Sequence, residues 1–402
     1  MSTAIDTPDS RLLVLIPDRL SDLVSKGEII ERYYNPGNLF AEVHLVMTND
    51  DTPDLAALQK MVGHARLFLH NLPDSRKVFV RTLGWRPWLL GPWVAKALDL
   101  AQAVRPTLIR CHGALLNTFA AAAIKRKLGI PYVVSMHINP DEDVRGRARG
   151  WVRRLVTRLQ QDIERIGLLN ADLVMPVYRP IVPYLQRLGV TRYEVCYNSL
   201  NPTHLRRKDD YRLHDPVRVL SVGRQFEDKN PDNLIKAVAQ LPNVRLTLVG
   251  DGPYHAHLRR VAEQCDIVDR VAFLPSLPND ELCRKLPDFD IFATHSEYWE
   301  ISKSVLEPLL TGLPVVINRR RGAPVPELTD DMCLLVPNTA EGYHQALERL
   351  IADGDYRERL GRSAYAHAQT NWSPAVTEAK FVAMYLSVLE ESGSKSFVAK
   401  PC

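Results

Sequence analysis

Short runs of β-branched and aliphatic residues alternate along most of the chain with longer stretches in which apolar residues recur at helical spacing. In the first half these runs cover residues 12–17, 42–47, 77–81, 107–112, 131–137 and 172–177. In the second half they cover residues 217–223, 244–250, 270–275, 290–295, 314–318 and 333–337. Strands that regularly alternate with helices predict a parallel sheet covered on both faces. The pattern therefore predicts an α/β protein with two Rossmann-like sheets in tandem and a cleft between them.

The alternation pauses at residues 206–216 (RRKDDYRLHDP), a charged stretch without apolar periodicity that we interpret as a linker. It separates a predicted N-terminal domain over residues 1–205 from a C-terminal domain over residues 217–373. Residues 374–392 follow the turn NWSP and carry helical periodicity without a strand, so they predict a terminal helix. Residues 393–402 are predicted to be a tail.

Composition and charge narrow the class of protein. Of 402 residues, 46% are hydrophobic and 24% are charged, which excludes a mainly disordered chain. A net charge of +4 is too small to indicate nucleic acid as the main partner. The 6 cysteines form no C-x-x-C pair, which predicts reduced thiols and a cytoplasmic location. Neither a basic leader nor an apolar run of about 18 residues is found, so we expect a soluble protein, at most at a membrane surface.

Ligands of open α/β sheets bind beyond the carboxyl ends of the strands, so strand exits are the first places to look for a site. One predicted strand ends at Gly223, and Arg224 and Lys229 flank the loop that follows. Asn230 is expected to cap the next helix, with Pro231 at its first position. Two cations beside the positive end of a helix suit a diphosphate, although a solvated basic loop would have the same sequence.

A second strand exit precedes a helix that Ser302 is expected to cap. Glu300 then lies in the loop before the helix and Glu307 lies inside it. The first-turn amides, including those of Ser304 and Val305, are expected to be unpaired and able to bind a phosphate. Glu307 lies among apolar residues, where a carboxylate needs a partner such as a ligand hydroxyl. A solvated glutamate on the helix face is the alternative.

The order and spacing of these motifs, continued by GLPVV and RGAPVPEL, resemble the nucleotide-sugar-binding half of the family-four retaining glycosyltransferases of GT-B fold. The resemblance covers residues 217–374. It also implies that the N-terminal domain binds the acceptor and that the terminal helix at residues 374–392 crosses back onto that domain. It implies that Arg224 and Lys229, beside Gly223, hold the donor diphosphate and that Glu307 binds the donor ribose. In that family a first glutamate, eight residues before the second, contacts the transferred sugar. Here that position is Trp299 and the carboxylate follows at Glu300, so either residue is a candidate for the sugar contact.

Three further candidates lie in the N-terminal half. The strand exit at His137 matches a position where the family often has a histidine that faces the sugar, although a structural histidine is the alternative. His112 ends the neighbouring strand and is a parallel candidate. Lys26 and Gly27 lie near the exit of the first strand, where many relatives have a glycine-rich loop. We interpret these two residues as a candidate acceptor-side loop.

A basic segment also lies in the N-terminal half. Six arginines fall within the 14 residues from Arg145 to Arg158, which contain no acid. Such a segment could bind an anionic acceptor or make peripheral contact with an anionic membrane at its inner surface. A solvated helix face is the competing interpretation.

The resemblance implies a metal-independent hexosyltransferase-type enzyme in glycan or glycoconjugate biosynthesis. It would move a sugar, with retention, from a nucleoside-diphosphate sugar to an acceptor hydroxyl. No D-x-D stands where a divalent ion would bridge the diphosphate, so neither metal nor cofactor is expected. A sugar phosphorylase or nucleotide-sugar epimerase of similar fold is one alternative. A non-catalytic nucleotide-sugar-binding subunit is another, and Trp299 is the residue that motivates it. A dehydrogenase is disfavoured because no G-x-G-x-x-G follows the first strand.

Overall fold

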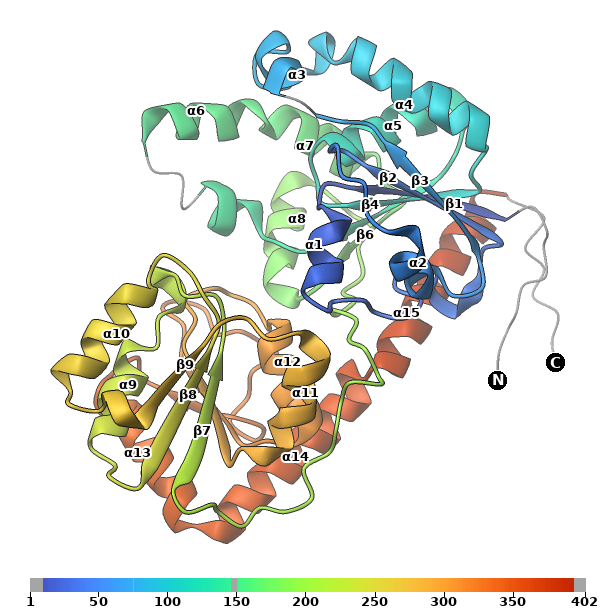
Figure 1. Ribbon diagram of the computed structural model, residues 1–402. Helices are drawn as coiled ribbons and strands as arrows, with labels where there is room; N and C mark the ends of the chain where they lie inside the picture. The colour runs from blue at the N-terminus through green and yellow to red at the C-terminus, as the bar shows by residue number, and fades with distance from the viewer. Residues whose placement is uncertain (1–9, 75, 146–149, 394–402) are drawn as a thin grey trace, which may run out of the picture. The chain divides into compact units, whose positions relative to one another are not determined.

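The computed structural model describes residues 10–74, 76–145 and 150–393, and its chain divides into two compact units. Unit 1 comprises Met1–Ser25, Ile29–Ser199 and the chain from Thr377 onward. Unit 2 comprises Lys26–Glu28 and Leu200–Val376. Each unit contains a six-stranded parallel sheet (Figure 1). The predicted α/β class with two Rossmann-like parallel sheets is therefore confirmed.

The sheet of unit 1 has the strand order β3-β2-β1-β4-β5-β6. Its strands are β1 (Arg11–Ile16), β2 (Glu42–Met47), β3 (Arg66–Asn71), β4 (Leu108–His112), β5 (Tyr132–Met136) and β6 (Leu173–Pro176). Leu12 and Leu13 point to opposite faces of β1 and both are buried. Burial of both faces explains why the central strands are continuous apolar runs rather than alternating patterns.

One strand prediction in unit 1 is wrong. Residues 77–81 form part of helix α3 (Arg76–Arg81), whereas the edge strand β3 at residues 66–71 was missed. The β-branched residues of 77–81 favour a strand in isolation, but Val80 is exposed and the segment has no neighbouring strand. Phe68 and other side chains of β3 are exposed because this strand lies at the edge of the sheet, so its apolar signal is weak.

Helices cover both faces of the unit 1 sheet. They are α1 (Leu20–Ser25), α2 (Leu55–Leu58), α3, α4 (Gly91–Val104), α5 (Leu116–Leu128), α6 (Trp151–Leu159), α7 (Gln161–Leu169), α8 (Val182–Leu188) and α15 (Pro374–Glu391). Phe381 and Tyr385 of α15 join the apolar cluster formed by Leu12 and Val14 of β1. An ion pair between Glu378 and Arg32 adds to this attachment. Most of the C-terminal helix is therefore part of unit 1.

Unit 2 repeats the topology, with the strand order β12-β11-β10-β7-β8-β9. Its strands are β7 (Val217–Val222), β8 (Val244–Val249), β9 (Val271–Leu274), β10 (Ile291–Thr294), β11 (Val315–Asn318) and β12 (Leu334–Val336). Its helices are α9 (Asp232–Ala239), α10 (His255–Gln264), α11 (Asn279–Lys285), α12 (Lys303–Thr311), α13 (Ala340–Ala352) and α14 (Gly354–Trp372). The order of connection reverses between β7 and β10, which makes their carboxyl ends the switch point where ligands of such sheets bind.

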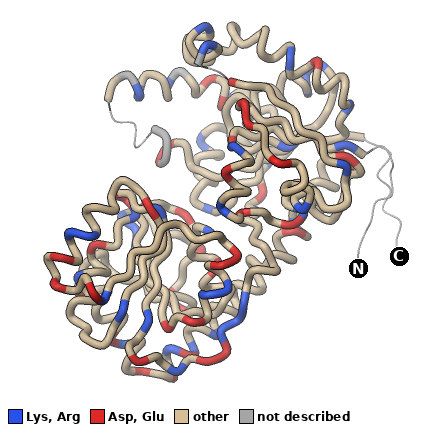
Figure 2. The backbone as a smooth tube through the Cα atoms, in the orientation of Figure 1, with Lys and Arg blue, Asp and Glu red and all other residues tan. Residues whose placement is uncertain are grey.

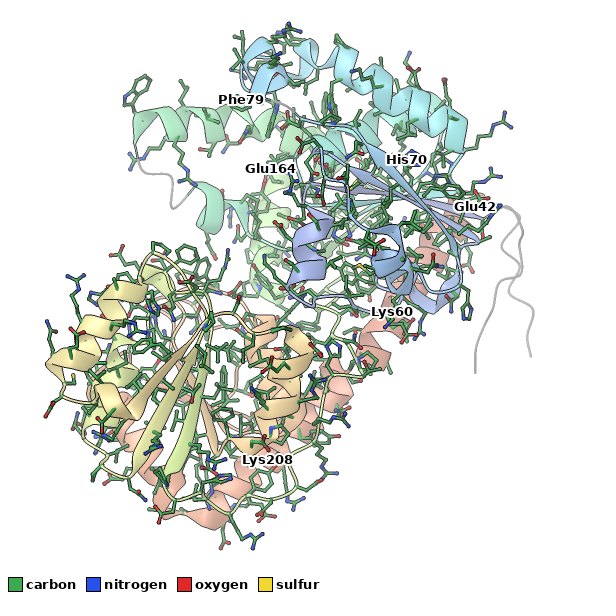
Figure 3. All side chains as sticks on the ribbon, in the orientation of Figure 1. Glu42, Lys60, His70, Phe79, Glu164 and Lys208 are labelled. Atoms are coloured by element: carbon green, nitrogen blue, oxygen red, sulfur yellow. The ribbon has the colours of Figure 1, made fainter. Side chains whose placement is uncertain are left out.

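The segment 206–216, expected to be a linker, belongs to unit 2 and packs against its other elements. The Lys208 amide donates to the Thr311 carbonyl and its ammonium donates to the Pro287 carbonyl (Figure 3). The Tyr211 hydroxyl donates to the Gly312 carbonyl. Both side chains are buried, so this charged stretch is held by specific contacts that apolar periodicity cannot indicate.

Charge is dispersed rather than segregated. Positions of Lys and Arg are interspersed with positions of Asp and Glu along the backbone of both units (Figure 2). Within the described residues, no helix is both long enough and apolar enough to cross a membrane.

Candidate functional site

A small polar pocket of about 20 Å³ lies at the switch point of unit 2. Its walls come from the ends of β7 and β10, the loop after each and the first turn of α12. The residues that line it are Ser221, Val222, Gly223, Gln225, Lys229, Pro231, Leu248, Val249, Thr294, His295, Ser296, Glu300, Ser302, Ser304, Val305 and Arg320. Five of the predicted site residues thus converge: Gly223, Lys229, Glu300, Ser304 and Val305.

Lys229 and Glu300 form an ion pair across this pocket. The Lys229 Nζ lies 2.5 Å from the Glu300 Oε1, and the two side chains are 17% and 18% exposed. The same ammonium lies 4.7 Å from the centre of the Tyr298 ring. The Glu300 carboxylate therefore neutralises the Lys229 ammonium within the pocket.

The exit of β7 is shaped by a close approach of two backbones. Gly250, at the end of β8, has a φ of 137°, and a Cβ there would lie 2.0 Å from the Gly223 carbonyl oxygen. Gln225 fixes the same loop, since its amide group donates to the Gly250 carbonyl at 2.8 Å. Gln225 is not among the predicted site residues, because a buried glutamine in a loop has no motif of its own.

Arg320 holds the loop that carries Glu300. Its guanidinium is buried and donates to the Tyr298 carbonyl and the Asn318 carbonyl, each at 2.7 Å. Trp299 turns away from the pocket lining, since its indole N–H donates to the Ala323 carbonyl at 2.8 Å. Of the two candidates for the sugar contact, the carboxylate lines the pocket and the indole packs on the neighbouring loop.

Helix α12 begins as expected, with one correction. Ser302 is the N-cap residue, but its hydroxyl is paired with that of Ser304 at 2.9 Å rather than with a backbone amide. The Val305 amide donates to the Ser302 carbonyl at 3.0 Å, so the expectation of an unpaired amide at Val305 is wrong. In a first turn that has hydrogen bonds between residues three apart, the backbone N–H groups donate to carbonyl groups of the same turn.

Glu307 lies inside α12 and is 4% exposed. Burial raises the pKa of Glu307 to about 7, although the Asn279 amide group, which donates to its Oε1 at 2.8 Å, acts in the opposite direction. His204 contacts the Asn279 Oδ1 at 3.0 Å and so fixes the amide orientation. Asn279 is a second residue missed in the sequence, where it appears only as a polar residue at a helix start.

Of the two cations in the loop after β7, Lys229 lines the pocket and Arg224 does not. Arg224 is exposed and stacks over the Phe226 ring at 5.3 Å, outside the lining of the pocket. Helix α9 begins at Asp232 with Pro231 as its N-cap, one position later than predicted. The Asn230 Oδ1 still accepts from the Asp232 amide at 3.3 Å, so its side chain supports the helix start from one residue further back.

The candidate acceptor-side loop belongs to unit 2. Gly27 has a φ of 65° and packs against Pro278, while the Lys26 carbonyl accepts from the Asn279 amide at 3.2 Å. Glu28 pairs with Lys303 of α12 at 3.3 Å. The segment therefore lies beside the helix starts that position Glu307.

Unit 1 holds a second, larger cavity of about 540 Å³, which we call the unit 1 cavity. It is lined by Pro17, Asp18, Thr48, Asn49, Asp74, Trp85, His112, Gly113, Ala114, Leu115, Leu116, Asn117, Met136, His137, Ile138, Pro140, Thr157, Gln160 and Glu164. The two predicted histidines meet here, with ring centres 5.5 Å apart and planes 13° from parallel. Burial and the neighbouring Arg110 hold the pKa of His112 well below its ordinary value of 6.5.

The basic segment is described in part. Residues 146–149, with Arg147 and Arg149, lie outside the described residues. Arg153, Arg154 and Arg158 are exposed on α6, where Trp151 is 77% exposed. The helix thus presents both charge and aromatic surface.

Each half of the chain matches a known protein family. Residues 206–367 match the family described as glycosyl transferases group 1, and residues 37–200 match the glycosyl transferase 4-like domain. The two matches together leave little of the described chain outside them.

Three relatives by sequence are described as transferases. The chain is 27% identical to a sulfoquinovosyl transferase of Arabidopsis thaliana over 68% of this chain and 56% of that protein. It is 33% identical to a lipopolysaccharide core biosynthesis glycosyltransferase of Rhizobium meliloti over 43% of this chain and 51% of that one. The chain thus spans about half the length of these two relatives. A GDP-mannose-dependent mannosyltransferase of Corynebacterium glutamicum is 28% identical over 82% of this chain and 94% of its own.

Solved structures agree on the fold. A sucrose-phosphate synthase of Thermosynechococcus elongatus superposes with a TM-score of 0.70 at 19% identity, covering 95% of this chain and all of that one. Anabaena HepE in complex with UDP and glucose superposes with a TM-score of 0.69 at 18% identity, covering 94% and 99% of the two chains. The fold is the GT-B glycosyltransferase fold.

Proposed function

We propose, from the premise that this chain belongs to the glycosyl transferases group 1, that it transfers a sugar from a nucleoside-diphosphate sugar to an acceptor hydroxyl with retention of configuration. The observation that carries the proposal is the convergence of Lys229, Glu300 and the start of α12 on one pocket at the switch point of unit 2. Relatives described as GDP-mannose-dependent, and HepE with UDP bound, make UDP and GDP sugars the first donors to test.

The pocket residues suit a diphosphate in which negative charge grows during the reaction. The acceptor oxygen forms a bond to the anomeric carbon as the bond from that carbon to the phosphate oxygen breaks. The departing phosphate takes the acceptor proton on the same face, so no enzymic nucleophile is required. Lys229 and the positive end of α12 stabilise the leaving diphosphate, and Arg224 supports it from the loop. These cations perform the task that a divalent ion has in other transferases, so we propose a metal-independent reaction.

Glu300, Glu307 and His137 are proposed to contact the transferred sugar and the ribose of the donor. Glu300 leaves Lys229 when the donor binds and accepts a hydrogen bond from a hydroxyl of the transferred sugar. Glu307 accepts from the ribose hydroxyls, which relieves the cost of its burial. His137 of unit 1 is the group proposed to meet the transferred sugar.

The test is product analysis with matched variants. Incubation with a UDP or GDP sugar and a panel of acceptors should release nucleoside diphosphate in proportion to glycoside formed, with the anomeric configuration retained by NMR. Lys229→Ala should lose about 2 to 4 kcal/mol of transition-state stabilisation. Lys236→Ala, at an exposed position on α9, should retain full turnover. Nucleotide release without a glycoside, or an epimerised sugar as product, would overturn the proposal.

A further inference from the structure

His295 is a residue of the unit 2 pocket to which the proposed function gives no task. It directly follows β10, lines the pocket together with Lys229 and Arg320, and is 5% exposed. Its Nε2 lies 2.8 Å from the Glu297 Oε1, while its Nδ1 is buried and has no hydrogen-bond partner among the described residues. A buried polar atom without a partner costs free energy, so this nitrogen marks a place for a polar ligand group.

The Glu297 carboxylate selects the tautomer of the His295 ring. An ionised carboxylate only accepts hydrogen bonds, so the imidazole Nε2 carries a proton and donates it. The Asn338 amide group donates to the same Glu297 Oε1 at 3.2 Å and holds the carboxylate in place. In a neutral imidazole the Nδ1 then has a lone pair, which accepts a hydrogen bond but cannot donate one.

Charged groups on several elements decide whether that Nδ1 is protonated. Burial is the largest influence and lowers the pKa of His295 from its ordinary value of 6.5. Arg320, on the loop after β11, acts in the same direction. The hydrogen bond and charge of Glu297, and the charge of Asp232 at the start of α9, act in the opposite direction. The His295 ring in this structure is therefore neutral at neutral pH.

A phosphate bound in this pocket would change that balance. The pocket volume of about 20 Å³ has room for about one water-sized group, so a phosphoryl group that replaces Glu300 at Lys229 also lies beside His295. A phosphate oxygen is repelled by a lone pair and attracted by an N–H group, so a bound anion raises the pKa of the imidazole. The Glu297 carboxylate, at the other ring nitrogen, stabilises the imidazolium that forms.

We propose that His295 is a further phosphate-binding residue of this site and that its Nδ1 takes up a proton from solvent when the diphosphate binds. The inference rests on the proposed function, in which a nucleoside diphosphate occupies this pocket. The imidazolium donates from Nδ1 to a phosphoryl oxygen and from Nε2 to Glu297. Because the complex holds one proton more, its affinity falls as the pH rises from the pKa of the free ring to that of the bound ring.

The test is calorimetry of UDP and GDP binding to the full chain. Titrations at pH 7.5 in buffers of different ionisation enthalpy count the protons taken up. The diphosphate and Glu307 also titrate near this pH, so the informative quantity is the difference between the wild type and His295→Gln. Glutamine can still donate to Glu297 but remains uncharged. We expect this variant to take up about half a proton fewer per nucleotide. The ratio of wild-type to variant affinity should fall about fivefold to tenfold between pH 6.5 and 8.5.

A second variant and a matched control complete the experiment. Glu297→Gln removes the charge that stabilises the imidazolium and should also lower the proton count, so it decides the matter alone if His295→Gln fails to fold. His64→Gln, at an exposed position of unit 1, should change neither the proton count nor the pH dependence.

The outcomes separate the inference from the proposed function. Nucleotide binding with an equal proton count in the wild type and both variants would overturn the inference and leave the proposed function intact. A lower count in the variants, together with a wild-type protein that transfers no sugar, would overturn the proposed function instead. No binding of either nucleotide would overturn both.

Discussion

Replacing Glu307 with glutamine is expected to stabilise unit 2 at alkaline pH while weakening nucleotide binding. The carboxylate is 4% exposed, and burial raises its pKa from an ordinary 4.5 to about 7. Stability linked to this group is therefore fully present below pH 4.5 and is lost as the pH rises through 7. The pKa difference between those two values, at about 1.4 kcal/mol per pH unit, corresponds to about 3.5 kcal/mol. Glutamine retains an oxygen for the Asn279 donor and avoids this cost.

Hydrogen exchange measured on individual peptides is the suitable assay, because it reports the stability of unit 2 separately from that of unit 1. Amides of β10 and α12 in Glu307→Gln should gain about 3.5 kcal/mol of protection at pH 8 and almost none at pH 4.5. Glu348→Gln, at an exposed position on α13, should change neither value. Calorimetry with the preferred nucleoside diphosphate should show a loss of about 1.5 to 3 kcal/mol in binding free energy. A gain in protection that is equal at both pH values, or a loss at pH 8, would refute the reasoning.

Three further outcomes are expected. Glu300→Gln removes the partner of Lys229, so nucleoside diphosphate affinity should rise about fivefold to tenfold in calorimetry while turnover falls; weaker nucleotide binding would contradict this. Gly250→Ala places a methyl group against the Gly223 carbonyl and should destabilise unit 2 by roughly 2 kcal/mol or more in urea unfolding, whereas unchanged stability would show that the loop relaxes freely. Asn279→Ala removes a donor that lowers the pKa of Glu307, so the pH midpoint of nucleotide binding should move upward; an unchanged midpoint would exclude the ribose role of that carboxylate.

The central strands could be predicted because they are buried on both faces and therefore remain apolar throughout. The edge strand β3 could not be predicted, because its exposed polar side chains interrupt the apolar pattern. Residues 77–81, which form part of α3, have a more strand-like sequence than β3 has. Motif spacing located Lys229 and Glu300 but could not reveal that they pair with each other, because that contact depends on how two loops fold. Asn279 escaped detection for a related reason, since its importance lies in a hydrogen bond to a residue 28 positions away.

The division of unit 1 along the chain has a consequence for biosynthesis. Phe381 and Tyr385 cover the same sheet face as Leu12 and Val14, yet the ribosome makes them only after every strand of unit 2. A nascent chain consequently carries an uncovered apolar face throughout the synthesis of its second half, and such surfaces attract chaperones and promote aggregation. Unit 2 has all but three of its residues in one continuous stretch and can complete its core first. The order of maturation is thus the reverse of the order of translation, with the first strand made being among the last to be fully buried.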